Sequence, residues 1–246
     1  MKSVLETLTQ RRSIRRYERE PINREIMKSI YEAIRNTPTS YNGQQFSVID
    51  VSDQSIKEEL YLVTQQKQIK TCNRLLVFCA DFNKIKLLAN HYNIKYPEFE
   101  NSIDGLLVGV IDATLAMMNA MVAAEAHHLG TCCIGYIRTA NPEKVTEILG
   151  LPKGVFAVCG LAIGIPREKP DIKPKQPQSL LIHQNHYRTD DMTEELADYD
   201  ALISVFNRTR CGDRSDNDWV AHILDYHRMA MIHDLKPFLN NQGFSI

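Results

Sequence analysis

The chain has almost no net charge. Its 29 lysines and arginines are balanced by 30 aspartates and glutamates, which leaves a formal charge of −1 over 246 residues. Nucleic acids and anionic membranes attract proteins through an excess of positive charge. We therefore expect no nucleic-acid partner and no membrane partner, and any site for an anion must be a local cluster of cations.

Several motifs of nucleotide-binding and acyl-transfer enzymes are missing. Neither G-x-G-x-x-G nor G-x-x-x-x-G-K-[ST] occurs, so the sequence supports neither a Rossmann site nor a P-loop. A nucleophile elbow, which would support a Ser/His/Asp triad, is also missing. His183-x-x-His186 has no obvious third ligand beside it, so we expect no metal ion.

The six cysteines include no C-x-x-C pair. Several lie in apolar runs, and we expect them to be buried, reduced core thiols, which fits a reducing cytosol. Two are adjacent, which raises the possibility of a redox thiol, but no lysine or arginine flanks them and we favour inert cysteines. The cysteines are Cys72, Cys79, Cys132, Cys133, Cys159 and Cys211.

No charge-free apolar run is long enough to span a membrane. The most apolar stretch, from Ile103 to Leu129, is interrupted by Asp104, Asp112 and Glu125. We expect a buried central helix, with a composition also suited to packing against a second subunit. The first residues do not resemble a signal peptide, so the expected location is the cytoplasm.

Periodicity and breaker residues predict a mixture of helices and strands. Strands and helices show no clean βαβ repetition, which favours one α+β layer domain with long terminal extensions. The stretch from about Asn83 to Glu100 is expected to be a mobile excursion, and Pro166 to Pro177, with four prolines, to be extended. Helices are expected at 3–10, 22–35, 53–64, 103–129, 142–149, 191–208 and 218–236, and strands at 46–51, 75–80, 131–137 and 155–165.

Three cation clusters stand out on this nearly neutral chain. Guanidinium groups bind phosphate in a planar fork, and a serine hydroxyl adds a further donor. Cations near a helix C-terminus or on a solvated surface are the alternative interpretation of each cluster. Together they suit a ligand with several anionic groups without identifying it. The clusters are Arg11-Arg12-Ser13-Ile14-Arg15-Arg16, Lys173-Pro174-Lys175, and Arg208-Thr209-Arg210 with Arg214 nearby.

The first cluster, extended to Tyr17 and followed by Pro21-Ile22, resembles the opening of the nitroreductase and flavin reductase family. Further matches follow along nearly the whole chain. Asp171-Ile172-Lys173-Pro174 resembles a signature of the oxygen-insensitive, NADPH-preferring subgroup. The other matching segments are Gln44, Gln66-Lys67, Val77 to Asp81, Ala123 to Glu125, Ile134-Gly135, Leu149 to Pro152, Gly164-x-Pro166, Tyr199 to Trp219 and Lys236 to Leu239.

This resemblance implies an α+β fold with a mixed sheet flanked by helices and an extended C-terminal helical excursion. It implies one FMN-binding domain over residues 1–246, with a C-terminal extension from about 190, and an intertwined homodimer with FMN at the interface. The implied activity is a ping-pong transfer of hydride from NADPH, with NADH as an alternative donor, through FMN to nitroaromatic, quinone or flavin acceptors.

The resemblance also implies the residues of the site. No catalytic amino acid is expected, because the chemistry takes place on FMN, although Arg15 has a possible electrostatic role. Arg210 is expected to bind NADPH at its 2′-phosphate. The expected cofactor-binding residues are Arg11, Arg12, Ser13, Arg15, Ser40, Gln44, Gln66, Ile134, Gly135, Lys173 and Lys175.

Two departures from the family pattern concern the space and the donors around the cofactor. Tyr136 replaces a glycine beside the expected flavin, which narrows the acceptor site, and Lys175 replaces an arginine and loses bidentate geometry. Two other functions remain open at this point. The first alternative is a non-catalytic flavin-binding storage or sensing protein on the same fold. The second is a flavin-free phosphate-binding interaction protein.

Overall fold

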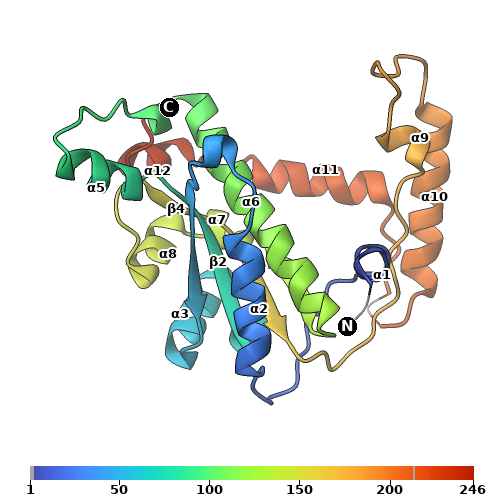
Figure 1. Cartoon of the computed structure of the whole chain (residues 1–246). Helices are drawn as coiled ribbons and strands as arrows, with labels where there is room; N and C mark the ends of the chain where they lie inside the picture. The colour runs from blue at the N-terminus through green and yellow to red at the C-terminus, as the bar shows by residue number, and fades with distance from the viewer. Residues whose placement is uncertain (1–2, 213) are drawn as a thin grey trace. The chain divides into compact units, whose positions relative to one another are not determined.

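The computed structural model describes residues 3–212 and 214–246. It divides into two compact units, one formed by Met1–Lys169 with Asp234–Ile246, and the other by Pro170–His233. The first unit holds the sheet and most of the helices, coloured blue to yellow in Figure 1 with a red C-terminal helix. The expected α+β composition is confirmed.

A four-stranded sheet in the order β1-β2-β4-β3 forms the centre of the first unit. All neighbouring strands run antiparallel, with Phe46 opposite Ala80 at one edge and Ile134 opposite Gly160 at the other. The apolar strand at 75–80 is central, as expected. The strands are β1 (Phe46–Val51), β2 (Arg74–Asp81), β3 (Gly130–Ile134) and β4 (Val155–Gly164).

The arginine-rich segment after the first helix extends this sheet. Ser13 makes a parallel bridge to Thr131 of β3, and Tyr17 makes an antiparallel bridge to Pro166. The Tyr17 hydroxyl donates to the carbonyl of Ile14 at 2.5 Å, and burial raises the pKa of this phenol, so it stays protonated. The segment is therefore an ordered edge of the sheet.

Capping residues begin several helices of the first unit where the sequence predicts them. The side chains of Ser3, Asn23 and Asp53 accept hydrogen bonds from the first turns of α1, α2 and α3. The helices are α1 (Val4–Gln10), α2 (Arg24–Arg35), α3 (Gln54–Thr64), α4 (Lys67–Thr71), α5 (Asn83–His91), α6 (Ile103–Ala126), α7 (Tyr136–Thr139), α8 (Pro142–Leu149) and α12 (Lys236–Asn241), with short 3-10 turns η1 (Ser40–Asn42) and η2 (Phe99–Asn101).

Each face of the sheet carries its own hydrophobic core. Helices α2 and α6 pack on one face, where Ile30 of α2 and Ala116 of α6 share a cluster with Phe78 of β2 (Figure 1). On the other face, Leu60 of α3 and Ile69 of α4 belong to a second cluster. The two apolar faces of β2 explain why its sequence is a continuous apolar run.

Helix α6 is buried along one side and exposed along the other. Its alanines and Gly109 face β2, and a side chain at Gly109 would come within 2.8 Å of the Phe82 ring. Among the described residues, α6 alone is long and apolar enough to cross a membrane by length and composition. The core helix of a soluble protein passes the same test. The predicted buried central helix is thus confirmed on one side only.

The structure differs from three sequence predictions about local structure. The stretch 83–100, expected to be a mobile excursion, begins with α5 (Asn83–His91) and ends at Glu100, which is fully buried and ion-paired with Lys86. The strand expected at 131–137 ends at Ile134, because the chain turns at Gly135 into α7. The helix expected at 218–236 ends at Ala230.

The second unit contains most of the proline-rich segment, from Pro170 on, and two longer helices. Residues 166–177 contain no helix and no strand beyond the bridge at Pro166, as their prolines predict. The helices are α9 (Gln178–Leu181), α10 (Thr193–Thr209) and α11 (Trp219–Ala230). Tyr199 of α10 and Trp219 of α11 pack edge to face, with ring centroids 5.4 Å apart.

Candidate functional site

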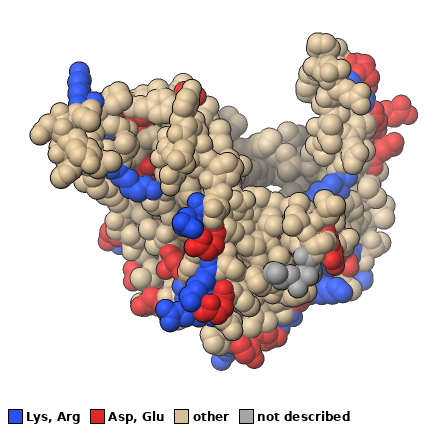
Figure 2. All heavy atoms as spheres, in the orientation of Figure 1, with Lys and Arg blue, Asp and Glu red and all other residues tan. Residues whose placement is uncertain are grey.

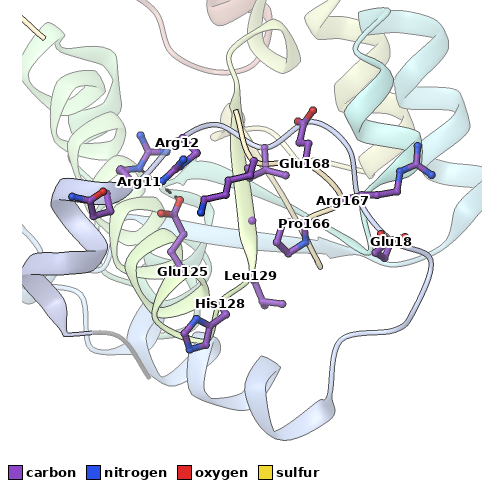
Figure 3. A pocket seen from close by; sticks show the side chains of 13 residues that line it. Arg11, Arg12, Glu18, Glu125, His128, Leu129, Pro166, Arg167 and Glu168 are labelled. Carbon is purple, nitrogen blue, oxygen red and sulfur yellow. Dashed lines mark ion pairs between the residues drawn. The ribbon is translucent and has the colours of Figure 1, made fainter. Parts of the chain in front are cut away.

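A cavity of about 570 Å³ lies in the first unit beside the arginine-rich segment. Figure 3 shows Arg11 and Arg12 entering it from the segment after α1, and Glu125 from the end of α6. Cations and carboxylates alternate around it, which makes it a local polar site on a nearly neutral chain. It is lined by Gln10, Arg11, Arg12, Ile14, Glu18, Glu125, His128, Leu129, Gly130, Pro166, Arg167, Glu168 and Lys169.

Arg11 is held by a buried carboxylate. Its Nε lies 3.7 Å from Oε1 of Glu125, whose side chain is only 8% exposed. The Thr131 hydroxyl donates a hydrogen bond to the same carboxylate oxygen. Arg11 Nε is itself buried and has no hydrogen-bond partner within the described residues. The Glu125 carboxylate thus holds the guanidinium through its Nε side, at the wall of the cavity.

Glu168 holds the backbone of the arginine-rich segment from the opposite side. Its Oε1 accepts hydrogen bonds from the backbone N–H groups of Arg15, at 2.6 Å, and Arg16, at 3.1 Å. Its other oxygen lies 3.7 Å from Nε of Arg16. Sequence reasoning missed both Glu168 and Glu125. An acidic residue near cations in the sequence is the signal that could have pointed to them. That signal does not tell which cation the carboxylate contacts in the folded chain.

The predicted residues Ser13, Ile134 and Gly135 lie along the same edge of the sheet as the cavity. Ser13 pairs with β3, and Ile134 ends that strand. Gly135 is exposed, with open space where a side chain would stand. Tyr136, expected to narrow the acceptor site, is 42% exposed at the first turn of α7. The end of β3 is therefore open in the single chain.

Gln66 precedes α4 on the second hydrophobic core of the sheet. Its side-chain oxygen accepts a hydrogen bond from Nε2 of Gln68 at 3.0 Å. Ile69 of α4 shares the core cluster with Ile14 and Ile134, so the structure joins three predicted segments through one core.

The remaining residues of the first unit, Ser40 and Gln44, lie in the loop before β1. Strands β1 and β3 are at opposite edges, separated by β2 and β4. Three strand spacings amount to about 14 Å. A single chain therefore does not bring this loop to the end of β3.

Lys173, Lys175 and Arg210 belong to the second unit. Both lysines are exposed. Arg210 follows α10 as its C-cap, with its guanidinium carbon 6.0 Å from the centre of the Phe206 ring. Its Nε is buried and makes no hydrogen bond within the described residues.

The adjacent thiols of Cys132 and Cys133 are poor nucleophiles. Cys72, Cys79 and Cys132 are buried as expected, whereas Cys133 and Cys211 are exposed, which the expectation of buried thiols did not foresee. Desolvation raises the pKa of Cys133 to about 11 and also raises that of Cys132. Thiolate is scarce at neutral pH with such values, which argues against a redox role for this pair.

The charged residues elsewhere are mostly paired or interspersed. In the face drawn in Figure 2, lysines and arginines stand beside aspartates and glutamates, and broad areas carry neither. Among the residues that the structure describes, no group of three or more His, Cys, Asp or Glu side chains is arranged to hold a metal ion.

Comparison with known proteins covers both units. Residues 8–165 match the nitroreductase family, and residues 173–246 match the nitroreductase family C-terminal domain. An FMN reductase [NAD(P)H] of Bacillus subtilis is 36% identical over 248 residues, covering 100% of this chain and 99% of the relative. An oxygen-insensitive NADPH nitroreductase of Salmonella typhimurium is 35% identical over 250 residues, covering 100% and 99%.

Solved structures of similar proteins also match nearly the whole chain. A hypothetical oxidoreductase from Bacillus subtilis superposes with a TM-score of 0.94 at 36% identity, over 100% of this chain and 99% of that one. An NADPH:FMN oxidoreductase from Vibrio harveyi, complexed with NAD⁺, superposes with a TM-score of 0.84 at 25% identity, over 98% of each chain. With its fold, its arginine-rich edge and both of its units matched, this chain belongs to the nitroreductase family.

Proposed function

We propose that this chain is an FMN-dependent NAD(P)H oxidoreductase. The observation that carries the proposal is the cavity beside β3, which is lined by the guanidinium groups of Arg11 and Arg12. Relatives that match the whole chain are named FMN reductase and NADPH nitroreductase, which favours an enzyme over a flavin-storage or sensing protein.

The residues around the cavity suit an anionic cofactor. Arg11 and Arg12 line it, and guanidinium groups bind phosphate and carbonyl oxygens through paired N–H donors. Glu125 and Glu168 fix the cations and the backbone without neutralising the cavity completely, since its lining holds four lysines and arginines against three glutamates. FMN, with one phosphate and a polar ring edge, fits this donor set.

We propose that FMN is bound by residues along this edge of the sheet and by further residues that the family resemblance implies. In this proposal Arg11, Arg12, Ser13 and Arg15 hold the phosphate and part of the ring, and Arg15 supplies a positive charge near the ring. Backbone N–H groups at Ile134 and Gly135 face the ring edge. Ser40, Gln44 and Gln66 contact ribityl or ring atoms, Lys173 and Lys175 reach the phosphate, and Arg210 binds the 2′-phosphate of NADPH.

When bound, FMN supplies the redox chemistry, taking hydride from NADPH and passing electrons to a nitroaromatic, quinone or flavin acceptor in a ping-pong cycle. The protein groups bind and orient the reactants and stabilise negative charge through fixed cations. No thiol or hydroxyl nucleophile is needed. NADH is the alternative donor.

We propose a homodimer as the working form. The exposed side of α6 carries a stripe of large apolar residues, which a second copy would bury. A second copy would also supply the loop of Ser40 and Gln44, which lies across the sheet from β3 in its own chain. The stripe residues and their exposures are Ile103 70%, Leu107 50%, Ile111 52%, Leu115 41% and Met118 37%.

We further propose that both units act as one FMN-binding domain, with a C-terminal extension from about residue 190, and that the enzyme is cytoplasmic. All six cysteines are free, which suits a reducing compartment. Cell fractionation tests the location.

The test of the function is a visible absorption spectrum of the purified protein, followed by anaerobic addition of NADPH and, separately, NADH. We expect a yellow protein that NADPH bleaches faster than NADH. A yellow protein that neither nucleotide bleaches would make the non-catalytic flavoprotein the better interpretation. A protein that stays colourless after FMN is supplied would contradict FMN binding itself.

A further inference from the structure

The loop between α2 and β1 has an unfavourable backbone. Tyr41, Asn42 and Gln44 all have left-handed conformations, with φ of 51°, 53° and 53°. Side chains with a Cβ adopt this region at an energetic cost, which asparagine reduces but does not remove. The Tyr41 side chain is fully exposed, so its own packing does not compensate. Some other group must hold the loop in this form.

Thr39 and Lys84 each bond to the backbone of Gln44, and Asp112 contributes a buried carboxylate. Asp112 lies in α6, is only 1% exposed, and directs both carboxylate oxygens at the loop. Oδ1 accepts a hydrogen bond from the backbone N–H of Ser40 at 3.2 Å, and Oδ2 accepts one from Gln45 at 3.1 Å. One buried carboxylate thus fastens the beginning and the end of the left-handed stretch to the core helix.

An asparagine at this position cannot make the same pair of bonds. A carboxylate offers an acceptor oxygen to each amide, whereas a carboxamide offers one oxygen and one NH₂ group. The NH₂ group would face a backbone N–H, and two donors in contact leave a buried amide unsatisfied. The loop therefore depends on a side chain with two acceptor oxygens rather than on the size of the side chain.

We propose that Asp112 is a positioning residue for cofactor binding, which presets the loop that carries Ser40 and Gln44. This inference rests on the proposed function, in which those two side chains contact FMN. A loop fixed in advance binds without an ordering penalty, whereas a freed loop raises the apparent Kd by the inverse of its competent fraction. The carboxylate acts through the backbone and does not itself touch the cofactor.

The test compares Asp112→Asn with Asn119→Ala as a matched control. Asn119 is a partly buried polar residue of the same helix, and it bonds to Ala33 in α2 and to Thr37 just after α2, outside the 40–45 stretch that Asp112 fastens. FMN affinity of the apoprotein is measured by fluorescence titration, and chymotrypsin cleavage after the exposed Tyr41 reports loop release. We expect Asp112→Asn to raise the Kd for FMN about tenfold or more, which is the typical effect of losing one hydrogen bond to a charged group. We also expect it to accelerate cleavage after Tyr41. Asn119→Ala should do neither.

Wild-type FMN binding, measured first, separates the two levels of the inference. If the wild type does not bind FMN, the proposed function fails and the role of Asp112 falls with it. If the wild type binds and Asp112→Asn binds equally well, only the role of Asp112 is overturned. Should Asp112→Asn not fold, residue-resolved hydrogen exchange of the wild-type apoprotein decides. Slow exchange at the Ser40 and Gln45 amides relative to Tyr41 supports the clamp, and fast exchange at both overturns it.

Discussion

At the scale of single residues, burial distinguishes the cations of the arginine-rich segment from one another. Arg15 and Arg16 are exposed and contact Glu168 through their backbone, whereas Arg11 is partly buried, pairs with Glu125 and lines the cavity. The run of six residues from Arg11 to Arg16 does not reveal this difference in the sequence. We therefore expect Arg11 to make the strongest single contribution to the proposed binding of FMN.

We therefore expect Arg11→Ala to raise the Kd for FMN about tenfold or more, because a hydrogen bond to a charged group is lost, worth about 1.5 kcal/mol or more. Fluorescence titration of the apoprotein measures it. Arg19→Ala is the matched control, since Arg19 is exposed and does not line the cavity. Equal affinities for Arg11→Ala and the wild type would show that this guanidinium does not hold FMN.

At the scale of elements, α6 combines three tasks on different sides. Its small residues pack on β2, Asp112 fastens the loop before β1, and its exposed stripe remains without a partner in the single chain. Ile111 lies one residue before Asp112. The residue that fastens the 40–45 loop and the proposed dimer interface are therefore adjacent on one helix.

Ile111→Asp is expected to convert the dimer into a monomer, because a charge cannot be buried in an apolar interface without a partner. Sedimentation or light scattering measures the mass. Leu62→Asp serves as the control, since Leu62 is 68% exposed on α3, outside the stripe. A wild type that sediments as a monomer, or an Ile111→Asp variant that remains dimeric, would refute the proposed interface.

At the scale of the whole molecule, the two proposed binding tasks use different arginines of the two units, while Lys173 and Lys175 of the second unit are also assigned to the FMN phosphate. The cavity with Arg11 and Arg12 lies in the first unit, and Arg210 lies in the second, Pro170–His233. Two family models match the two parts of the chain separately. Binding of FMN and preference for NADPH should therefore respond to different substitutions.

Arg210→Ala is expected to lower kcat/KM for NADPH about tenfold, equivalent to about 1.4 kcal/mol, and to leave the value for NADH and the Kd for FMN unchanged. Only NADPH carries the phosphate that this guanidinium is proposed to bind. Arg208→Ala, an exposed arginine two residues earlier, is the control. Parallel losses with both nucleotides would argue for a structural role of Arg210 instead.

The sequence by itself determined the local elements and the family. Caps at Ser3, Asn23 and Asp53, the apolar run of β2 and the prolines after Gly164 act through neighbouring residues, so their effects are readable in order along the chain. The arginine-rich motif likewise predicted a phosphate-type site, and it carried the resemblance to nitroreductases, which the comparisons confirm. These features require no knowledge of distant contacts.

Only the tertiary structure decided which distant groups meet. Glu125, Glu168 and Asp112 each contact a segment at least 67 residues away in the chain, and their acidic side chains carry no local pattern that names the partner. The strand order β1-β2-β4-β3 also separates Ser40 and Gln44 from Ile134 within one chain. The role that the resemblance implies for all three, contact with FMN, does not suggest this separation. Long-range pairing depends on how the sheet and α6 pack, because burial, not sequence spacing, selects those contacts.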